Sequence, residues 1–577
     1  MHRTSDSRVA ARHIRNVLRA VVVGMGAVHT VVAVLQQSMN EDGISYLDMG
    51  DAWLGGDWGL AISSVWSPAY GWLIAAVVNL SEASMRWEFP VVQLTNFAIF
   101  VLSLVAFEYF WNRLTLLYYA GSDDDGSARF PLPGWHVLGY SLFLWSSLTL
   151  IQIWSVTPDM SVAAVVYLAA GMLLNTAGEP VRYRALLLVG LLLGLGYLVK
   201  AALLPLGLVA LVLAALATAG PLRRRALGLA VSVAAMLAVA APQIAALSSS
   251  AGHLTMGDVG RFTYLKHVNE MPYPDFHGAV GELRGEPRHP PRRVFDEPPV
   301  YEFAEPVAGT YPMAFDPGYW TAGLKPAVSV QGQARALLTS AIFFFDLFVR
   351  TQGGFLAVVL LLALMSHRRG LRFDGPAALV LWSLAAFSMY SIVHVLPRYI
   401  APFVVLFWAG LVAGMRFPAN AAGKKLATTG AMLMSLFVWI NLGAFNLDGL
   451  RRVTGFTPLS ETASQPAPEA EQPRADHPRI AAELLRLGLR SGDPVGFIGY
   501  SYSEYWARLG RFRIIAEIHW HDTGRFWNAS TEHQAGAIDA FAGTGAAAVV
   551  AAPVSIEELP PGWQAVGDTG YLIYRLR

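Results

Sequence analysis

The chain has 577 residues, of which 54% are hydrophobic and only 14% are charged. Soluble domains carry about a quarter of their residues as charges, so this composition excludes an ordinary soluble protein and predicts an α-helical polytopic membrane protein. The net charge of +1 argues against a nucleic-acid partner, and the absence of cysteine excludes disulfides, thiolate catalysis and Cys-ligated zinc.

The N-terminal region combines basic residues with a first apolar segment. Five arginines lie within residues 3–19, and the apolar segment extends over 17–37. Its length is near the roughly 20 residues that cross a bilayer, and Gln36-Gln37-Ser38 is a poor cleavage context. We therefore expect a retained first helix, with its amino end in the cytoplasm by the positive-inside rule.

The next stretch, residues 38–88, is rich in acids and aromatic rings although it adjoins a membrane-spanning helix. These residues are Glu41, Asp42, Tyr46, Asp48, Asp51, Trp53, Asp57, Trp58, Trp66, Tyr70 and Trp72. Ionisable groups near hydrocarbon are costly and usually functional, and amphipathic rings favour the membrane–water boundary. The sequence therefore predicts a reaction site in this loop, at the outer membrane surface.

Eleven apolar segments have lengths suited to crossing a bilayer. They are residues 17–37, 89–111, 134–154, 160–177, 185–199, 201–219, 225–247, 353–366, 376–395, 398–416 and 426–446. The run at 66–80 is too short to cross comfortably, and as an interfacial helix it leaves the later basic clusters, such as Arg223–Arg225, in the cytoplasm. The odd count places the C-terminal region outside and Asp123–Asp125 in a solvated cytoplasmic loop. We expect a multi-pass protein of the bacterial cytoplasmic (inner) membrane.

Two regions next to the spans have their own composition. The 248–352 outer loop ends in an aromatic segment, 336–350, which is expected to lie in the interface as an amphipathic anchor; the alternative is a twelfth helix or a core piece. After the transmembrane domain, residues 1–446, a Pro/Glu/Ala-rich stretch at 447–478 is expected to form a flexible linker.

Residues 479–577 are expected to form a small α/β extracytoplasmic domain. Short β-type runs at 494–500, 512–518 and 546–552 alternate with helical stretches, and residues 563–576 close the chain as a hairpin. The G-x-G-x-x-G spacing of dinucleotide-binding units is absent. We interpret this domain as an accessory platform.

The outward-facing polar residues suit a group transfer from a donor that is already attached to a lipid phosphate. One carboxylate must accept the proton of an acceptor hydroxyl, and cations or a metal must stabilise the departing phosphate. Asp42, followed by Gly43, is the preferred base, because glycine allows the backbone to approach a substrate. Asp159 is the second catalytic acid, and Lys200 and Arg398 are the cations for the phosphate. Further substrate-binding candidates are Glu41, Tyr46, His394 and Tyr399.

Each candidate also has a structural explanation. Asp42 can be an ordinary loop carboxylate or cap, Asp159 a helix cap, and the two cations can snorkel to headgroups. His394 can be structural. Elsewhere in the first loop, Asp48 and Asp51 are interpreted as solvating a helix whose other face buries Leu47, Leu54 and Trp58.

Three motifs carry a family resemblance. D-G-I-S-Y-L-D-M-G-D begins at Asp42, S-P-x-Y-G-W begins at Ser67, and T-P-D ends at Asp159. Together they resemble the GT-C superfamily of membrane glycosyltransferases, and most the bacterial branch related to protein O-mannosyltransferases and the lipid A aminoarabinose transferase. The resemblance implies inverting transfer of a sugar from a polyprenyl-phosphate carrier on the outer face, with Asp42 as base. It also matches Asp159 to the second acid and Arg398-Tyr399 to the R-Y of a late helix.

The resemblance leaves metal dependence open. Where the aminoarabinose transferase has Glu-Lys before the proline of the first loop, this chain has Trp66-Ser67. A divalent metal ion would need ligands from a set that shows no recognised spacing: Asp42, Asp159, His253, His267 and His277.

The leading hypothesis is a glycosyltransferase that uses a polyprenyl-phosphate-linked sugar donor, a membrane lipid, and an unidentified acceptor hydroxyl. A transporter or flippase of lipid-linked saccharides is the alternative, although transporters tend to contain internal repeats and none is found here. A third possibility, a non-catalytic scaffold, predicts that the first-loop acids can be neutralised without loss of function.

Overall fold

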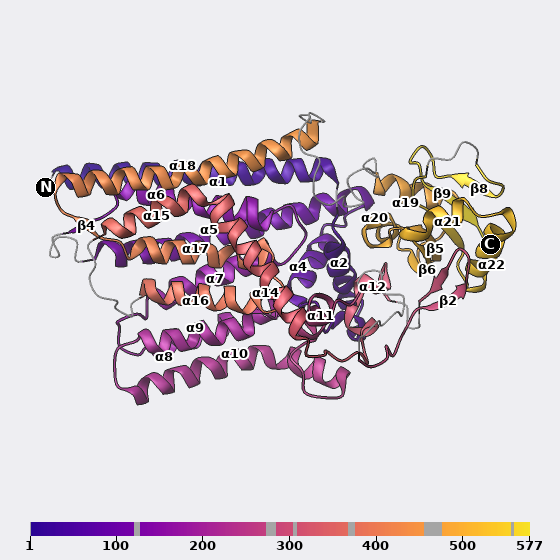
Figure 1. Cartoon of the computed structure of the whole chain (residues 1–577), viewed down its shortest axis with the longest axis horizontal. Coiled ribbons are helices and arrows are strands. Elements are labelled where there is room, and N and C mark those ends of the chain that lie inside the picture. Colours follow the sequence, from indigo (N-terminus) through magenta and orange to yellow (C-terminus); the bar gives the residue numbers. More distant parts are fainter. Residues whose placement is uncertain are drawn as a thin grey trace.

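The computed structural model describes residues 2–37, 39–120, 127–272, 284–303, 308–366, 375–454, 476–554 and 559–577, and the side chains of these except 2–11 and 444–454. A bundle of long helices forms one side of the molecule and a small sheet domain the other (Figure 1). The N-terminus lies at the end of the bundle remote from the sheet, and the C-terminus lies in the sheet domain. Asp123–Asp125 and His277 lie outside the described residues.

All eleven predicted segments fall on helices of the bundle. These are α1 (His2–Gln36), α5 (Met85–Tyr119), α6 (Leu132–Trp145) with the π-helix η1 (Ser146–Ile151), α7 (Asp159–Leu174), α8 (Tyr183–Val199), α9 (Leu203–Ala217), α10 (Leu222–Ala251), α15 (Gly353–Met365), α16 (Gly375–Ser391), α17 (Pro397–Ala413) and α18 (Ala421–Thr454). Five helices of the described part are long and apolar enough to cross a membrane, and seven more are apolar but shorter. The chain is an α-helical polytopic membrane protein.

Polar and small residues connect neighbouring helices of the bundle. Arg19 of α1 donates two hydrogen bonds to the carboxylate of Glu108 on α5, at 2.5 and 2.6 Å. A Cβ atom at Gly190 of α8 would come within 2.1 Å of the Ser232 carbonyl oxygen on α10, so these two helices cross with their backbones in contact. Such close packing of small residues is typical of membrane helices.

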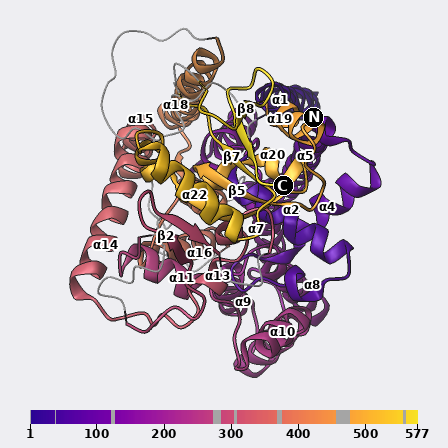
Figure 2. The same cartoon turned by 90° about the vertical axis from the view of Figure 1, so that its right-hand side faces the viewer.

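The closing segment of the large loop is longer and more regular than the sequence indicates. Helix α14 (Val330–Phe345) begins where the Ser329 side chain accepts a hydrogen bond from the Gly332 amide, and it continues through the π-helix η2 (Asp346–Thr351) toward α15. Its 22 residues meet the length and composition of a membrane-spanning helix, as the alternative of a twelfth helix requires. Figure 2 shows α14 at the periphery of the bundle; its depth in the membrane stays a prediction.

The first loop folds into α2 (Glu41–Leu54), α3 (Trp58–Ala61) and α4 (Pro68–Leu80). Helices α2 and α4 cross closely, because a Cβ at Gly50 would lie 2.5 Å from the Gly71 carbonyl oxygen and one at Gly71 would lie 2.7 Å from that of Tyr46. With 13 residues, α4 is about 20 Å long, which is shorter than the bilayer core of about 30 Å.

The sheet domain has seven strands in the order β2-β3-β6-β5-β7-β9-β8. They are β2 (Arg292–Phe295), β3 (Val300–Glu302), β5 (Pro494–Gly499), β6 (Arg513–His519), β7 (Ala548–Ala551), β8 (Trp563–Ala565) and β9 (Leu572–Arg575). The central three strands are parallel, and β8 and β9 form the predicted hairpin. Strands β2 and β3 come from the large outer loop, a contribution that the sequence analysis missed.

The remaining elements are short. They are β1 (Ser127–Ala128), α11 (Val259–His267), α12 (Pro312–Phe315), α13 (Pro317–Trp320), β4 (Phe417–Pro418), α19 (His477–Arg486), α20 (Tyr505–Leu509), α21 (Thr523–Trp527), α22 (Thr531–Gly543) and the 3₁₀ segments η4 (Ser501–Ser503) and η5 (Trp520–Asp522). Of these, α11, α12 and α20 contribute residues that lie beside the first loop.

Candidate active site

Four predicted residues meet where the ends of α2, α7, α8 and α17 come together. Arg398 donates a hydrogen bond from Nη2 to Asp42 Oδ2 at 2.9 Å, and its Nε lies 3.5 Å from Asp159 Oδ2. Lys200 Nζ donates to the other oxygen of Asp159 at 2.5 Å. Two acids and two cations, separated by up to 356 positions in the chain, thus form one continuous ion-pair chain.

Local structure explains why the two acids are neighbours. The Asn40 side chain, at the start of α2, accepts a hydrogen bond from the Val156 amide at 2.8 Å and donates one to the Val156 carbonyl at 3.3 Å. This pair holds the first turn of α2, with Asp42, against the turn that leads into α7 and Asp159. Gly43 is needed for the same contact, since a Cβ there would lie 2.7 Å from Val156 Cβ. The sequence predicts that Gly43 lets the backbone approach a substrate. In the structure, Gly43 lets it approach this turn instead.

Burial differs among the four side chains. Asp159 is 2% exposed, whereas Asp42, Lys200 and Arg398 are 20 to 25% exposed and are therefore accessible to a ligand. Pro158 occupies the cap position of α7, and the Asp159 carboxylate binds the two cations rather than the helix amides. A cap-only or snorkelling role is thus not what the structure shows for these residues.

The two tyrosines occupy different environments. Lys200 Nζ lies 3.8 Å above the ring of Tyr399, a cation–π contact that fixes the ammonium group. Tyr46 is buried and packs against the rings of Trp66 and Tyr70, with centroids 5.3 and 5.2 Å away. Tyr46 therefore lies in the packing between α2 and α4.

Trp66-Ser67, the departure from the family pattern, connects the loop to its neighbours. The Ser67 hydroxyl accepts a hydrogen bond from the Ala201 amide at 2.9 Å, directly beside Lys200. Trp66 donates from its ring nitrogen to the carbonyl of Phe315 on α12 at 3.1 Å. Ser67 therefore holds the chain at the end of α8, and Trp66 joins the first loop to α12.

Lys266 of α11 is a candidate that the sequence analysis missed. Burial lowers its pKa, and the nearby carboxylates of Glu41 and Asp42 partly oppose this effect. The Lys266 amine is therefore close enough to Glu41 and Asp42 to interact with both electrostatically. No motif surrounds Lys266 in the large loop, so only the folded structure identifies it.

His394 does not face an open space but stacks on His267 of α11. The ring centroids lie 3.8 Å apart and the planes are 3° from parallel. Burial, His394 and Lys266 lower the pKa of His267 to about 4, and burial with Lys266 and Arg398 lowers the pKa of His394. Both imidazoles are neutral at pH 7 in the folded protein.

The histidine pair predicts a loss of stability in acid. Because the pKa of His267 is about 4 in the folded state and about 6.5 in the unfolded chain, the unfolded state gains protons first as the pH falls. The thermal unfolding midpoint is expected to fall between pH 6.5 and pH 4. His267→Gln should reduce this dependence, whereas His13→Gln, at an exposed position, should not; equal pH profiles for all three proteins would contradict the assignment.

The described candidates for a metal ligand bind other partners. Among the residues that the structure describes, no three His, Asp or Glu side chains gather so as to hold a metal ion. Asp42 and Asp159 bind Arg398 and Lys200, His267 stacks on His394, and His253 is an exposed residue next to the Ala251 carbonyl.

Asp48 and Asp51 of α2 bind the sheet domain, which contradicts the interpretation of a solvated face. Asp48 is 9% exposed and forms an ion pair at 2.7 Å with Arg508 of α20; Asp51 pairs with the same guanidinium at 3.0 Å. Leu47 is buried as expected, but Leu54 and Trp58 are exposed. The spacing of these acids does not predict their ion pairs, because their partner lies 460 residues after Asp48 in the chain.

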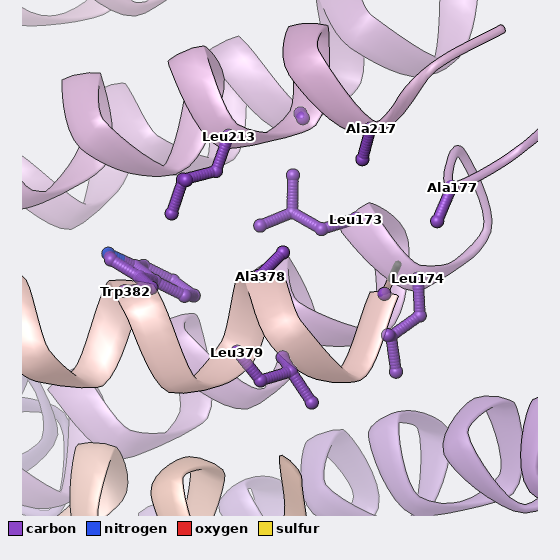
Figure 3. A pocket seen from close by; sticks show the side chains of 10 residues that line it. Leu173, Leu174, Ala177, Leu213, Ala217, Ala378, Leu379 and Trp382 are labelled. Atoms are coloured by element: carbon purple, nitrogen blue, oxygen red, sulfur yellow. The ribbon is translucent and has the colours of Figure 1, made fainter. Parts of the chain in front are cut away.

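An apolar pocket lies away from this cluster. It is formed by α7, α9 and α16, with Leu173, Leu213, Ala378 and Trp382 among its side chains (Figure 3). Leu174, another lining residue, follows Asp159 by 15 positions, or about 22 Å along α7. The pocket contains no acid or base and is not part of the candidate site.

Comparisons with known proteins give two similar structures. No protein-family profile and no curated sequence matches the chain. The crystal structure of ArnT from Cupriavidus metallidurans bound to undecaprenyl phosphate is 13% identical, with a TM-score of 0.48 and coverage of 97% of this chain and 98% of that one. The Archaeoglobus fulgidus oligosaccharyltransferase in complex with Zn and sulfate is 12% identical, with a TM-score of 0.44 and coverage of 92% and 67%. Both TM-scores are below 0.5, so neither likeness identifies the function of this chain.

Proposed function

We propose that the chain is an integral-membrane glycosyltransferase that moves a sugar from a polyprenyl-phosphate carrier to an acceptor hydroxyl. The observation that carries this proposal is the ion-pair chain of Asp42, Arg398, Asp159 and Lys200. It combines an accessible carboxylate with cations suited to a phosphate, next to apolar helices that can adjoin a lipid tail. The GT-C-like motifs around Asp42 and Asp159 favour the same activity.

Binding of the donor is the first step. Arg398 and Lys200 present guanidinium and ammonium groups that bind a phosphate by charge-assisted hydrogen bonds, and the Lys266 amine lies near the same carboxylates. Asp159, buried between Lys200 and Arg398, keeps both cations oriented. A phosphate that takes the hydrogen bond of Arg398 Nη2 releases the Asp42 carboxylate, which then becomes free to act as a base.

Transfer follows as a single displacement. Asp42 accepts the proton of the acceptor hydroxyl, and the hydroxyl oxygen attacks the anomeric carbon of the sugar. The bond between that carbon and the phosphate oxygen breaks, and the polyprenyl phosphate leaves with the electron pair, stabilised by the cations. Attack opposite the leaving group inverts the anomeric configuration. Protonated Asp42 then returns its proton to solvent.

The charged residues at the two ends of α8 support a location of the candidate site at the outer membrane face. This helix begins beside Arg182 and Arg184 and ends at Lys200, about 26 Å away along its axis. The positive-inside rule favours a cytoplasmic arginine end, and this supports an outer-face location for the candidate site and the sheet domain in the bacterial inner membrane.

Identification of the lipid that copurifies with the protein tests the proposal. We expect native mass spectrometry to detect a bound polyprenyl phosphate in the wild type, and much less of it in Arg398→Ala. Recovery of ordinary membrane phospholipids alone from both proteins would contradict it. A flippase would also retain the lipid, but it would not lose its activity when Asp42 becomes Asn.

A further inference from the structure

Arg508 is a buried arginine that joins the sheet domain to the first loop. Arg508 is only 2% exposed. Its guanidinium forms ion pairs with Asp48 at 2.7 Å, Asp51 at 3.0 Å and Glu88 at 3.0 Å. Asp48 and Asp51 belong to α2, Glu88 belongs to α5, and Arg508 belongs to α20. One side chain thus joins α20 to two helices that lie more than 400 residues earlier in the sequence.

The surrounding hydrogen bonds complete this connection. Tyr505, from the same short helix, donates to Glu88 at 2.9 Å, and the Thr310 amide of the large loop donates to Asp48 at 2.6 Å. Removal of one partner of a buried ion pair leaves uncompensated charge and is strongly destabilising for the contact. Without Arg508, three acids would remain close together with no buried cation to hold them.

The geometry of α2 relates this anchor to the candidate base. Asp42, Asp48 and Asp51 share a helix of 14 residues. At 100° per residue, Asp48 and Asp51 lie roughly 240° and 180° around the helix axis from Asp42. Helix α2 is therefore held on one face by Arg398 of the bundle and on the opposite side by Arg508 of the sheet domain.

We propose that Arg508 is a positioning residue, which fixes α2 so that the Asp42 carboxylate faces the bound donor. This inference rests on the proposed function. It makes the sheet domain a required part of the transfer site, in contrast to an accessory platform. Arg508 does not touch the substrate; it acts through Asp48, Asp51 and the helix that carries Asp42.

The first test separates turnover from donor binding. In R508A we expect kcat to fall at least tenfold while KM for the lipid donor stays within about twofold, because Arg398 and Lys200 are held by other helices. R508K, which keeps the charge but not the planar fork, should be intermediate. If R508A does not fold, R508K takes its place in the same kinetic measurement. The matched control is R511A, since Arg511 is half exposed and pairs with Asp51 alone among the described acids; it should keep wild-type kinetics.

The second test measures the position of α2 without any assay of activity. The chain has no cysteine, so spin labels on L54C in α2 and L254C after α10 are unique, and both leucines are exposed. We expect a narrow distance distribution in the otherwise unchanged protein and in R511A, and a broad one in R508A. A short, rigid bis-maleimide bridge in R508A carrying D51C and R511C should fix α2 again and restore turnover.

The outcomes separate the two proposals. A folded R508A with wild-type kcat, or with an unchanged spin-label distribution, would overturn the positioning role. A loss of donor affinity equal to the loss of turnover would also overturn it, because it would show general disruption. If the wild type transfers no sugar, the proposed function fails, and the spin-label distances still decide whether Arg508 holds α2.

Discussion

Asp42→Asn is expected to lower sugar transfer by about 10²- to 10⁴-fold, the range that a general base contributes. The amide has nearly the same size as the carboxylate but cannot accept the proton of the acceptor hydroxyl. Asp159 and Lys200 remain paired in this variant, so the donor phosphate keeps its binding groups. Transfer should be measured in proteoliposomes at saturating donor, together with the thermal unfolding midpoint to verify folding.

Asp57→Asn is the matched control for this experiment. Asp57 lies in the same loop, but it is exposed and its side chain accepts a hydrogen bond from the Leu60 amide at the start of α3. It should transfer sugar at close to the wild-type rate. Undiminished transfer by a normally folded Asp42→Asn protein would refute the assignment of the base.

Arg398→Ala is expected to raise the donor concentration needed for half-maximal transfer by about 10- to 100-fold. A hydrogen bond to a charged group contributes roughly 1.5–3 kcal/mol, and about 1.4 kcal/mol corresponds to a factor of ten. The variant also removes a cation beside the buried Asp159, which keeps only Lys200. Initial rates over a range of donor concentrations measure the effect.

Two further variants limit the interpretation of this result. Arg398→Lys keeps the charge without the planar fork and should lie between Ala and wild type. Arg350→Ala removes an exposed arginine that pairs with Asp346 four residues away, and it should leave the donor dependence unchanged. If Arg398→Ala shows the same donor dependence as wild type, Arg398 does not bind the phosphate.

The helices could be predicted from the sequence because each depends on a local property. An apolar run of the length of α10 or α17 has few structural alternatives, and its signal is contained in about 20 consecutive residues. The aromatic run does not predict the beginning of α14, because this helix starts at a cap, Ser329, that lies before the run.

The candidate site could be predicted in part. Asp42, Asp159, Lys200 and Arg398 were each recognisable as charged residues at helix ends, and the structure brings all four together. Lys266 could not be found in this way, since nothing near it in sequence marks it.

Long-range partners account for the remaining errors. Asp48 and Asp51 have the spacing of a solvated helix face, and only Arg508, 460 residues after Asp48, shows that they are anchors. The same holds for β2 and β3, which complete a sheet whose other strands lie almost 200 residues later. Patterns of neighbouring residues contain no information on such pairings.

Transfer by the purified protein tests the central claim most directly. The protein is placed in proteoliposomes with a labelled polyprenyl-phosphate sugar and an acceptor fraction from the cell envelope, and labelled product and released polyprenyl phosphate are quantified. We predict that both appear in equal amounts with wild type and that both are lost with Asp42→Asn. Persistent absence of product with wild type, or transfer that uses a nucleotide sugar and leaves the lipid-linked donor intact, would contradict the account.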